Sequence, residues 1–262
     1  MTKDQLKELA QQTITIIKAG QYTNDDGEVK NLDWYIKKTI NETNIIGPEW
    51  VYPSLPKVER IPVVEVTTES TIWAMRRLLL YGCEPDALGC LNFASAKNPG
   101  GGFTWGTMAQ EEALAYSSTL YASLQAAPWF YEHHRTLEKE GKPPLYTNSV
   151  IVSPYVAFFR NDKFGFLDQP FSATVLTCAA PKTVEIKEKF PEVLDQVPTI
   201  IKQRMELIFR VAIDAGITHF VLGAWGCGIF QNDPFYVAEC FKEMVEKYGK
   251  YFEHIVFAIY SR

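Results

Sequence analysis

The stretch from Asn92 to Leu124 carries features that together could bind an anion and transfer a proton. Three consecutive glycines, residues 100–102, leave the backbone amides open to a phosphate or sugar, because no side chain stands in the way. Thr107 is expected to be the N-cap of the helix that follows, since Gln110 stands three residues later as in a capping box. A helix N-terminus also favours anions through its unpaired amides and its dipole.

Two adjacent carboxylates, Glu111 and Glu112, fall in the first turn and a half of this expected helix. Neighbouring residues on a helix point about 100° apart, so one carboxylate could hold a substrate hydroxyl while the other transfers a proton. Taken singly, a glycine run is typical of a flexible loop, and a glutamate pair is typical of a solvated helix start. The combination is more specific than either part.

The combined pattern resembles a known family signature. Residues 92–102 read NFASAKNPGGG, and after seven residues the sequence Gln-Glu-Glu follows at residues 110–112. This pattern resembles that of the poly(ADP-ribose) glycohydrolases, and more narrowly the short microbial type, whose core is a macrodomain. The resemblance implies hydrolysis of ribose–ribose O-glycosidic bonds and release of ADP-ribose. No metal is expected, since the sequence shows no carboxylate–histidine cluster for one, and no cofactor is expected. The resemblance also favours cleavage from the polymer ends.

A second glycine loop lies further along the chain. The expected strand 219–224 runs into Trp-Gly-Cys-Gly-Ile-Phe, and Asp233-Pro234 then supplies an N-cap and an N1 proline for another helix. Alone, such a loop is more often only tight packing, but GAWGCGIFQND resembles the diphosphate loop of macrodomains. No histidine stands near the loop cysteine in sequence, so backbone donation and packing are favoured over a nucleophilic role. The residues assigned to the ligand are Gly226, Cys227, Gly228, Ile229 and Phe230, with Phe230 against the distal ribose.

The resemblance makes Glu112 the acid that protonates the leaving oxygen and then takes a proton from water. Glu111 and Asn98 would hold hydroxyls of the reacting ribose. A helix N-terminus opposes protonation of a carboxylate, whereas burial under substrate, Glu111 and the diphosphate favour it, so we expect Glu112 to be protonated mainly in the complex. Adjacent residues do not easily flank a bond as paired glycosidase carboxylates do, so one carboxylate is expected to act as acid and then base. Further ligand contacts are expected from Gly100, Gly101, Gly102 and Gln110, which supports the loop, and the resemblance to macrodomains implies that Glu65 lies near the adenine.

Strands alternating with helices predict an α/β fold, a three-layer α/β/α sandwich with a mixed sheet, and the resemblance implies that it is a macrodomain. Residues 1–60 are expected to form a helical N-terminal extension on a core of residues 61–262. Residues 125–148 are expected to be a polar surface segment, with the pair His133-His134 in a surface loop. Residues 168–170 are expected to form a turn, and residues 181–198 a lid-like loop. Helices are expected at 3–19, 32–40, 71–82, 107–124, 200–215 and 234–247, and strands at 61–67, 87–93, 150–166, 172–179, 219–224 and 254–260.

Composition limits the partners. Proteins that coat nucleic acids are normally basic, so the net charge of −5 argues against that function. For the same reason, poly(ADP-ribose) or an ADP-ribosylated protein would bind through a local pocket. No apolar run approaches the roughly 20 residues of a membrane span. Five scattered cysteines without a Cys-x-x-Cys pair favour a reducing compartment and argue against structural zinc. We therefore expect a cytoplasmic or otherwise intracellular monomer.

Other functions stay open at this point. The same loops could serve a hydrolase that removes single ADP-ribose units from a side chain or small acceptor. A non-catalytic ADP-ribose reader is less favoured, because it needs neither Glu111 nor Glu112 for proton transfer. A nucleotide-binding or phosphate-transfer protein would suit the glycine loops, but no Gly-x-x-x-x-Gly-Lys-Ser/Thr motif is present.

Overall fold

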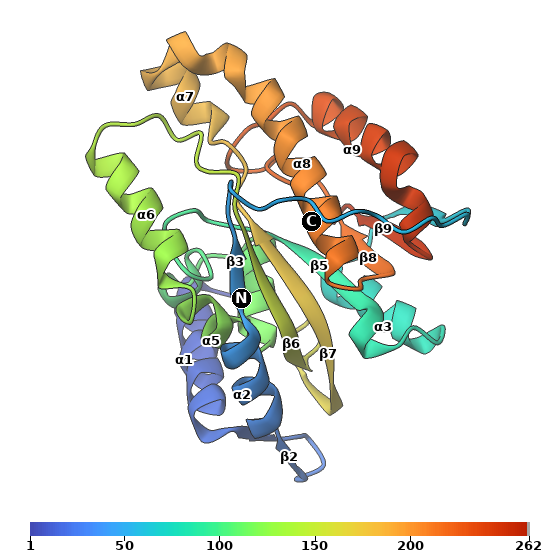
Figure 1. The fold of residues 1–262 in the computed structure, drawn as a ribbon. Helices are drawn as coiled ribbons and strands as arrows, with labels where there is room; N and C mark the ends of the chain where they lie inside the picture. Colours follow the sequence, from blue (N-terminus) through green and yellow to red (C-terminus); the bar gives the residue numbers. More distant parts are fainter. Residues whose placement is uncertain (261–262) are drawn as a thin grey trace.

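The computed structural model describes residues 1–260, which build a seven-stranded mixed sheet with helices on both faces (Figure 1). Along the sheet the strand order is β3 (Asn44–Ile46), β6 (Val150–Arg160), β7 (Phe166–Cys178), β5 (Leu88–Phe93), β8 (His219–Leu222), β9 (His254–Ala258) and β4 (Val63–Thr67). The strands from β7 to β4 are parallel to one another, while β6 is antiparallel to both β3 and β7. The three-layer α/β fold with a mixed sheet is confirmed.

Two apolar cores fill the space between the layers. One face of the sheet packs against α8 (Val197–Asp214) and α9 (Pro234–Tyr248), which lie side by side in Figure 1. The other face packs against α3 (Thr71–Leu80), α4 (Gln110–Ser117), α5 (Leu120–Gln125) and α6 (Pro128–Lys139). Both faces of the central parallel strands β5 and β8 are therefore buried, which accounts for their continuous apolar runs.

The N-terminal segment is helical, as expected, and it joins the sheet. Helix α1 (Lys3–Ala19) starts with a Thr2–Gln5 capping box and ends at the left-handed Gly20. The short hairpin β1 (Gln21–Thr23) and β2 (Val29–Asn31) and helix α2 (Asp33–Glu42) follow, before β3 pairs with β6. The boundary at residue 60 stays a prediction, because β3 belongs to the same sheet as the core strands.

The helix expected at 107–124 is corrected in two ways. It begins at Gln110 with Ala109 as N-cap, so Thr107 is not the cap. It also breaks at Ser118, where the chain is extended and forms a bridge with Phe158 of β6. Hydrogen bonds between Thr119 and Ala157 in both directions replace the helical bonds there. Pairing with the sheet thus overrides the local helical pattern.

Three other expectations were wrong. The segment 125–148 contains α6, whose apolar face and His134 are buried, so His133-His134 is not a surface loop. The turn falls at 161–165, where Asn161 Oδ1 accepts from the amides of Lys163 and Gly165, and residues 168–170 lie within β7. The expected loop 181–198 contains α7 (Thr183–Lys189) and the 3₁₀ helix η3 (Pro191–Gln196). No helix within residues 1–260 has the length and apolarity that a bilayer crossing requires.

Candidate active site

Glu112 is held by three donors at the start of α4. Its Oε1 accepts from the Gly102 amide at 2.8 Å and from the Thr107 hydroxyl at 3.0 Å, and its Oε2 accepts from the Ala109 amide at 2.8 Å. The last bond is half of a capping box, with Glu112 at the N3 position. Only 7% of Glu112 is exposed, so its carboxylate is fixed between the glycine loop and the helix N-terminus.

Glu111 is buried more deeply on the same helical turn, with 4% of its surface exposed. Its Oε2 accepts from the Ser95 amide at 2.6 Å, and its Oε1 lies 3.2 Å from Nδ2 of Asn92. Burial, the largest influence, raises the pKa of Glu111 to about 8, although these hydrogen bonds oppose the rise. Such a carboxyl is mostly neutral at pH 7, unlike an exposed glutamate.

The triple glycine packs directly against both carboxylates. A Cβ at Gly101 would lie 2.4 Å from Oε1 of Glu112 and 2.9 Å from Oε2 of Glu111, and Gly101 also has a left-handed φ of +61°. A Cβ at Gly102 would lie 2.0 Å from the Thr107 hydroxyl. The Gly101 amide donates to the Asn98 carbonyl and the Gly102 amide to Glu112, so both amides are used within the protein. These glycines bring the loop into contact with the glutamates.

Gln110 anchors the helix to the sheet. Its Oε1 accepts from the Phe93 amide, and its Nε2 donates to the Leu91 carbonyl and the Thr71 hydroxyl. All of its polar atoms therefore contact the protein, at the carboxyl end of β5. This placement agrees with a supporting role for Gln110.

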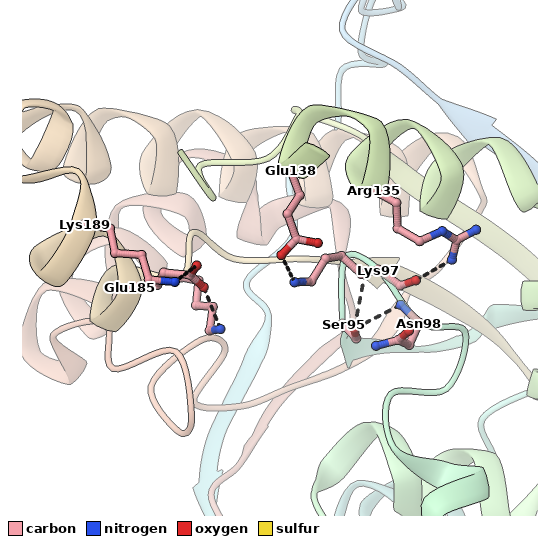
Figure 2. A network of polar contacts seen from close by, with 8 residues as sticks. Ser95, Lys97, Asn98, Arg135, Glu138, Glu185 and Lys189 are labelled. Atoms are coloured by element: carbon pink, nitrogen blue, oxygen red, sulfur yellow. Dashed lines mark hydrogen bonds and ion pairs between the residues drawn. The ribbon is translucent and has the colours of Figure 1, made fainter. Parts of the chain in front are cut away.

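Asn98 belongs to a loop that is bonded to residues of α6 (Figure 2). The Ser95 hydroxyl accepts from the amides of Lys97 and Asn98, and Arg135 of α6 donates to the Lys97 carbonyl at 2.6 Å. The Lys97 ammonium also pairs with Glu138 of α6 at 2.5 Å. Figure 2 shows these contacts together with Glu185 and Lys189 of α7. Asn98 itself is half-buried, and its backbone amide is one of these contacts.

The second glycine loop leaves the same edge of the sheet. Strands β5 and β8 are parallel neighbours, so the loops after their carboxyl ends lie side by side. The Phe93 ring, at the end of β5, would touch a Cβ at Gly223. Within residues 1–260, the amides of Gly228, Ile229 and Phe230 have no protein acceptor. This loop therefore offers free donors to an anion.

Side chains of the second loop differ in their surroundings. Ile229 is 76% exposed, whereas Phe230 is half-buried, with its ring centroid 6.4 Å from that of Tyr146. Burial raises the pKa of the Cys227 thiol to about 11, so the thiolate is scarce at neutral pH. Asn232 fixes the loop to the segment after β7, because its Nδ2 donates to the carbonyls of Gly226 and Pro181.

Glu65 is not brought together with the other candidates. It lies in the middle of the edge strand β4, where its carboxylate pairs with Arg77 of α3 at 2.7 Å and with His254 of β9 at 2.7 Å. His254 starts β9, at the opposite end from the glycine loops. Both oxygens of Glu65 are thus bound within the protein.

Three residues that contact the carboxylates were not predicted to do so from the sequence: Asn92, Ser95 and Thr107, which was expected to be an N-cap instead. Each bonds to Glu111 or Glu112. Their positions within the motif could have drawn attention to them, but the direction of a buried side chain or amide is not visible in sequence. Among the described residues, no three His, Cys, Asp or Glu side chains gather in a way that could hold a metal ion.

Comparison with known proteins gives a consistent family assignment. The family model of the microbial-type PARG catalytic domain matches residues 10–161. A solved poly(ADP-ribose) glycohydrolase from Thermomonospora curvata is 35% identical, with 97% of this chain and 93% of that chain covered and a TM-score of 0.90. The enzyme from Deinococcus radiodurans, solved in complex with ADP-ribose, is 37% identical, with 86% and 90% covered and a TM-score of 0.75. No curated protein matches the chain.

Proposed function

Because this chain belongs to the microbial-type poly(ADP-ribose) glycohydrolase family, we propose that its carboxylate pair hydrolyses ribose–ribose O-glycosidic bonds of poly(ADP-ribose) and releases ADP-ribose. One observation supports this most strongly. Glu111 and Glu112 are nearly buried, yet both approach the empty side-chain position of Gly101, at the sheet edge where a second loop offers free amides. A buried acid pair beside an anion-binding loop suits a diphosphate-linked sugar.

The binding roles follow from this arrangement. We assign the diphosphate to the space between the two glycine loops, with donors mainly from Gly228, Ile229 and Phe230, because the amides of Gly101 and Gly102 are already used. The Phe230 ring would pack against the distal ribose. Asn98 and Glu111 would hold hydroxyls of the reacting ribose, and Gln110 would hold the helix start in place.

We assign the proton transfers to Glu112. In the first step it donates a proton to the leaving ribose oxygen, while the C1–O bond breaks and its electron pair moves to that oxygen. An oxocarbenium-like ribose remains, and the negative charge of Glu112 stabilises it. Water then attacks C1, and its proton returns to Glu112, which restores the starting state. That Glu112 gains its proton in the complex stays a prediction.

The experiment compares two substrates. Wild-type protein is incubated with poly(ADP-ribose) and, separately, with a mono-ADP-ribosylated protein, and the products are separated by chromatography. We expect ADP-ribose from the polymer as the first product, without an early rise in oligomers, because we propose cleavage from the ends. Release only from the mono-ADP-ribosylated protein would refute the polymer reaction. Binding of ADP-ribose with no release from either would indicate a reader.

We further propose that the protein acts as a monomer inside the cell. The five cysteines are unpaired, and four of them are buried, which suits a reducing compartment. Sedimentation at micromolar concentration tests the oligomeric state, and a dimer would contradict this part of the proposal.

A further inference from the structure

Asn92, near the carboxyl end of β5, is the buried polar side chain that contacts Glu111 from the sheet. It is fully excluded from solvent, and its Nδ2 lies 3.2 Å from Oε1 of Glu111 and 3.2 Å from Oγ1 of Thr177 on β7. Its Oδ1 is also buried and has no hydrogen-bond partner within residues 1–260. An unpaired buried amide oxygen is costly, so this position calls for an explanation beyond packing.

An asparagine amide presents donors on one side and an acceptor on the other, and a threonine hydroxyl can play either part. With Nδ2 toward Oε1, Asn92 donates to an ionised Glu111. Rotation of the amide by 180° places Oδ1 there instead, where it accepts the proton of a neutral Glu111, while the Thr177 hydroxyl changes from acceptor to donor. We propose that Asn92 is a positioning residue whose amide holds Oε1 of Glu111 in either protonation state.

The surroundings of Glu111 agree with a proton on Oε1. Its Oε2 already accepts from the Ser95 amide at 2.6 Å. The titratable groups that face Glu111 are Glu112 on α4 and the hydroxyl of Tyr131 on α6, which is buried without a partner among the described residues. Burial, more than the charge of Glu112, raises the pKa of Glu111 to about 8.

This inference rests on the proposed function, since it concerns how the reacting ribose is held. A neutral Glu111 with its proton on Oε1 can still accept a hydrogen bond from a ribose hydroxyl at Oε2, and it removes one of two negative charges beside the substrate diphosphate. Once ionised, Glu111 would repel the diphosphate. The rate of hydrolysis should therefore fall on the alkaline side as Glu111 loses its proton.

The direct test is a titration that does not depend on activity. Protein with ¹³C-labelled glutamate carboxyls is titrated by NMR, and Glu111→Gln identifies the Glu111 signal. Asn92→Leu removes the amide bond to both forms of Glu111, and since a hydrogen bond to the charged form is the stronger of the two, we expect the midpoint of Glu111 to rise by roughly one pH unit. The alkaline limb of the kcat profile should move upward with it, and kcat should fall while KM changes little.

Two matched variants on β7 complete the test. Thr177→Val removes the second partner of the Asn92 amide and should raise the midpoint by a smaller amount. Thr174→Val makes the same change three residues earlier, where the side chain has no hydrogen bond within the described residues, and should leave the midpoint unchanged. An unchanged midpoint in both Asn92→Leu and Thr177→Val would overturn the proposal; if Asn92→Leu does not fold, Thr177→Val decides alone. Release of ADP-ribose by wild-type protein separately decides the proposed function.

Discussion

The substitution Gly101→Ala tests whether the triple glycine serves to seat the carboxylates. The added Cβ would stand 2.4 Å from Oε1 of Glu112, about 1 Å closer than the 3.4 Å at which ordinary contact begins. The carboxylate must therefore move by about 1 Å or the loop must shift, and either change breaks its bonds to the loop. A misplacement of about 1 Å at a reacting group lowers the rate by roughly 100-fold.

The variant is also expected to lose folding stability, through the strain of a side chain at a left-handed residue. Gly101 has a φ of +61°, and a side chain in this left-handed region costs roughly 1–2 kcal/mol. Gly216→Ala is a matched control, because its φ is +73° and nothing lies within 4 Å of its added Cβ. Both variants should lower Tm by differential scanning calorimetry, Gly101→Ala by more because the bonds of Glu112 to the loop also break, and only Gly101→Ala should release ADP-ribose about 100-fold more slowly. Equal rates in the two variants would refute the steric argument.

Three further predictions concern individual side chains. Since burial raises the pKa of Glu111 to about 8 from a usual 4.5, the native state binds this proton more tightly than the unfolded chain does. The free energy of unfolding should therefore fall as pH rises from about 4.5 to about 8. The Tm of Glu111→Gln should change less with pH over this range than the Tm of the wild type, and equal slopes would contradict the raised pKa of Glu111. Cys227 should react with iodoacetamide much more slowly than a free thiol at pH 7, because its pKa is about 11, and rapid labelling by mass spectrometry would count against this. Gln110→Leu leaves the amide of the half-buried Phe93 without its acceptor, which should cost about 1 kcal/mol in urea unfolding, whereas an unchanged midpoint would show that Gln110 is not an anchor.

Much of the fold could be predicted from periodicity and end signals. The apolar run at 219–224 and the Asp233-Pro234 helix start predict β8 and α9, because an N-cap and an N1 proline are local features. The break at Ser118 could not be predicted, since it depends on bonds to Ala157, a residue far away in the sequence. Helix α6 was missed because its buried face is built from aromatic residues and His134 rather than from aliphatic ones.

The candidate site was predictable in composition but not in orientation. The spacing of the triple glycine and Gln-Glu-Glu places Glu111 and Glu112 at a helix start, and both lie there in the structure. Sequence did not indicate that the amides of Gly101 and Gly102 turn inward, because the direction of a loop amide depends on φ and ψ. It also gave no sign that Glu65 pairs with Arg77 and His254, which are distant in the chain.

The central claim is that Glu112 transfers the protons, and one comparison tests it most directly. Release of ADP-ribose from poly(ADP-ribose) and the affinity for ADP-ribose are measured for wild-type protein and for Glu112→Gln. The account predicts that release falls by roughly 10²–10⁴-fold while ADP-ribose binding is retained, because only the proton transfer is lost. Release by Glu112→Gln at a rate near that of the wild type would contradict the account.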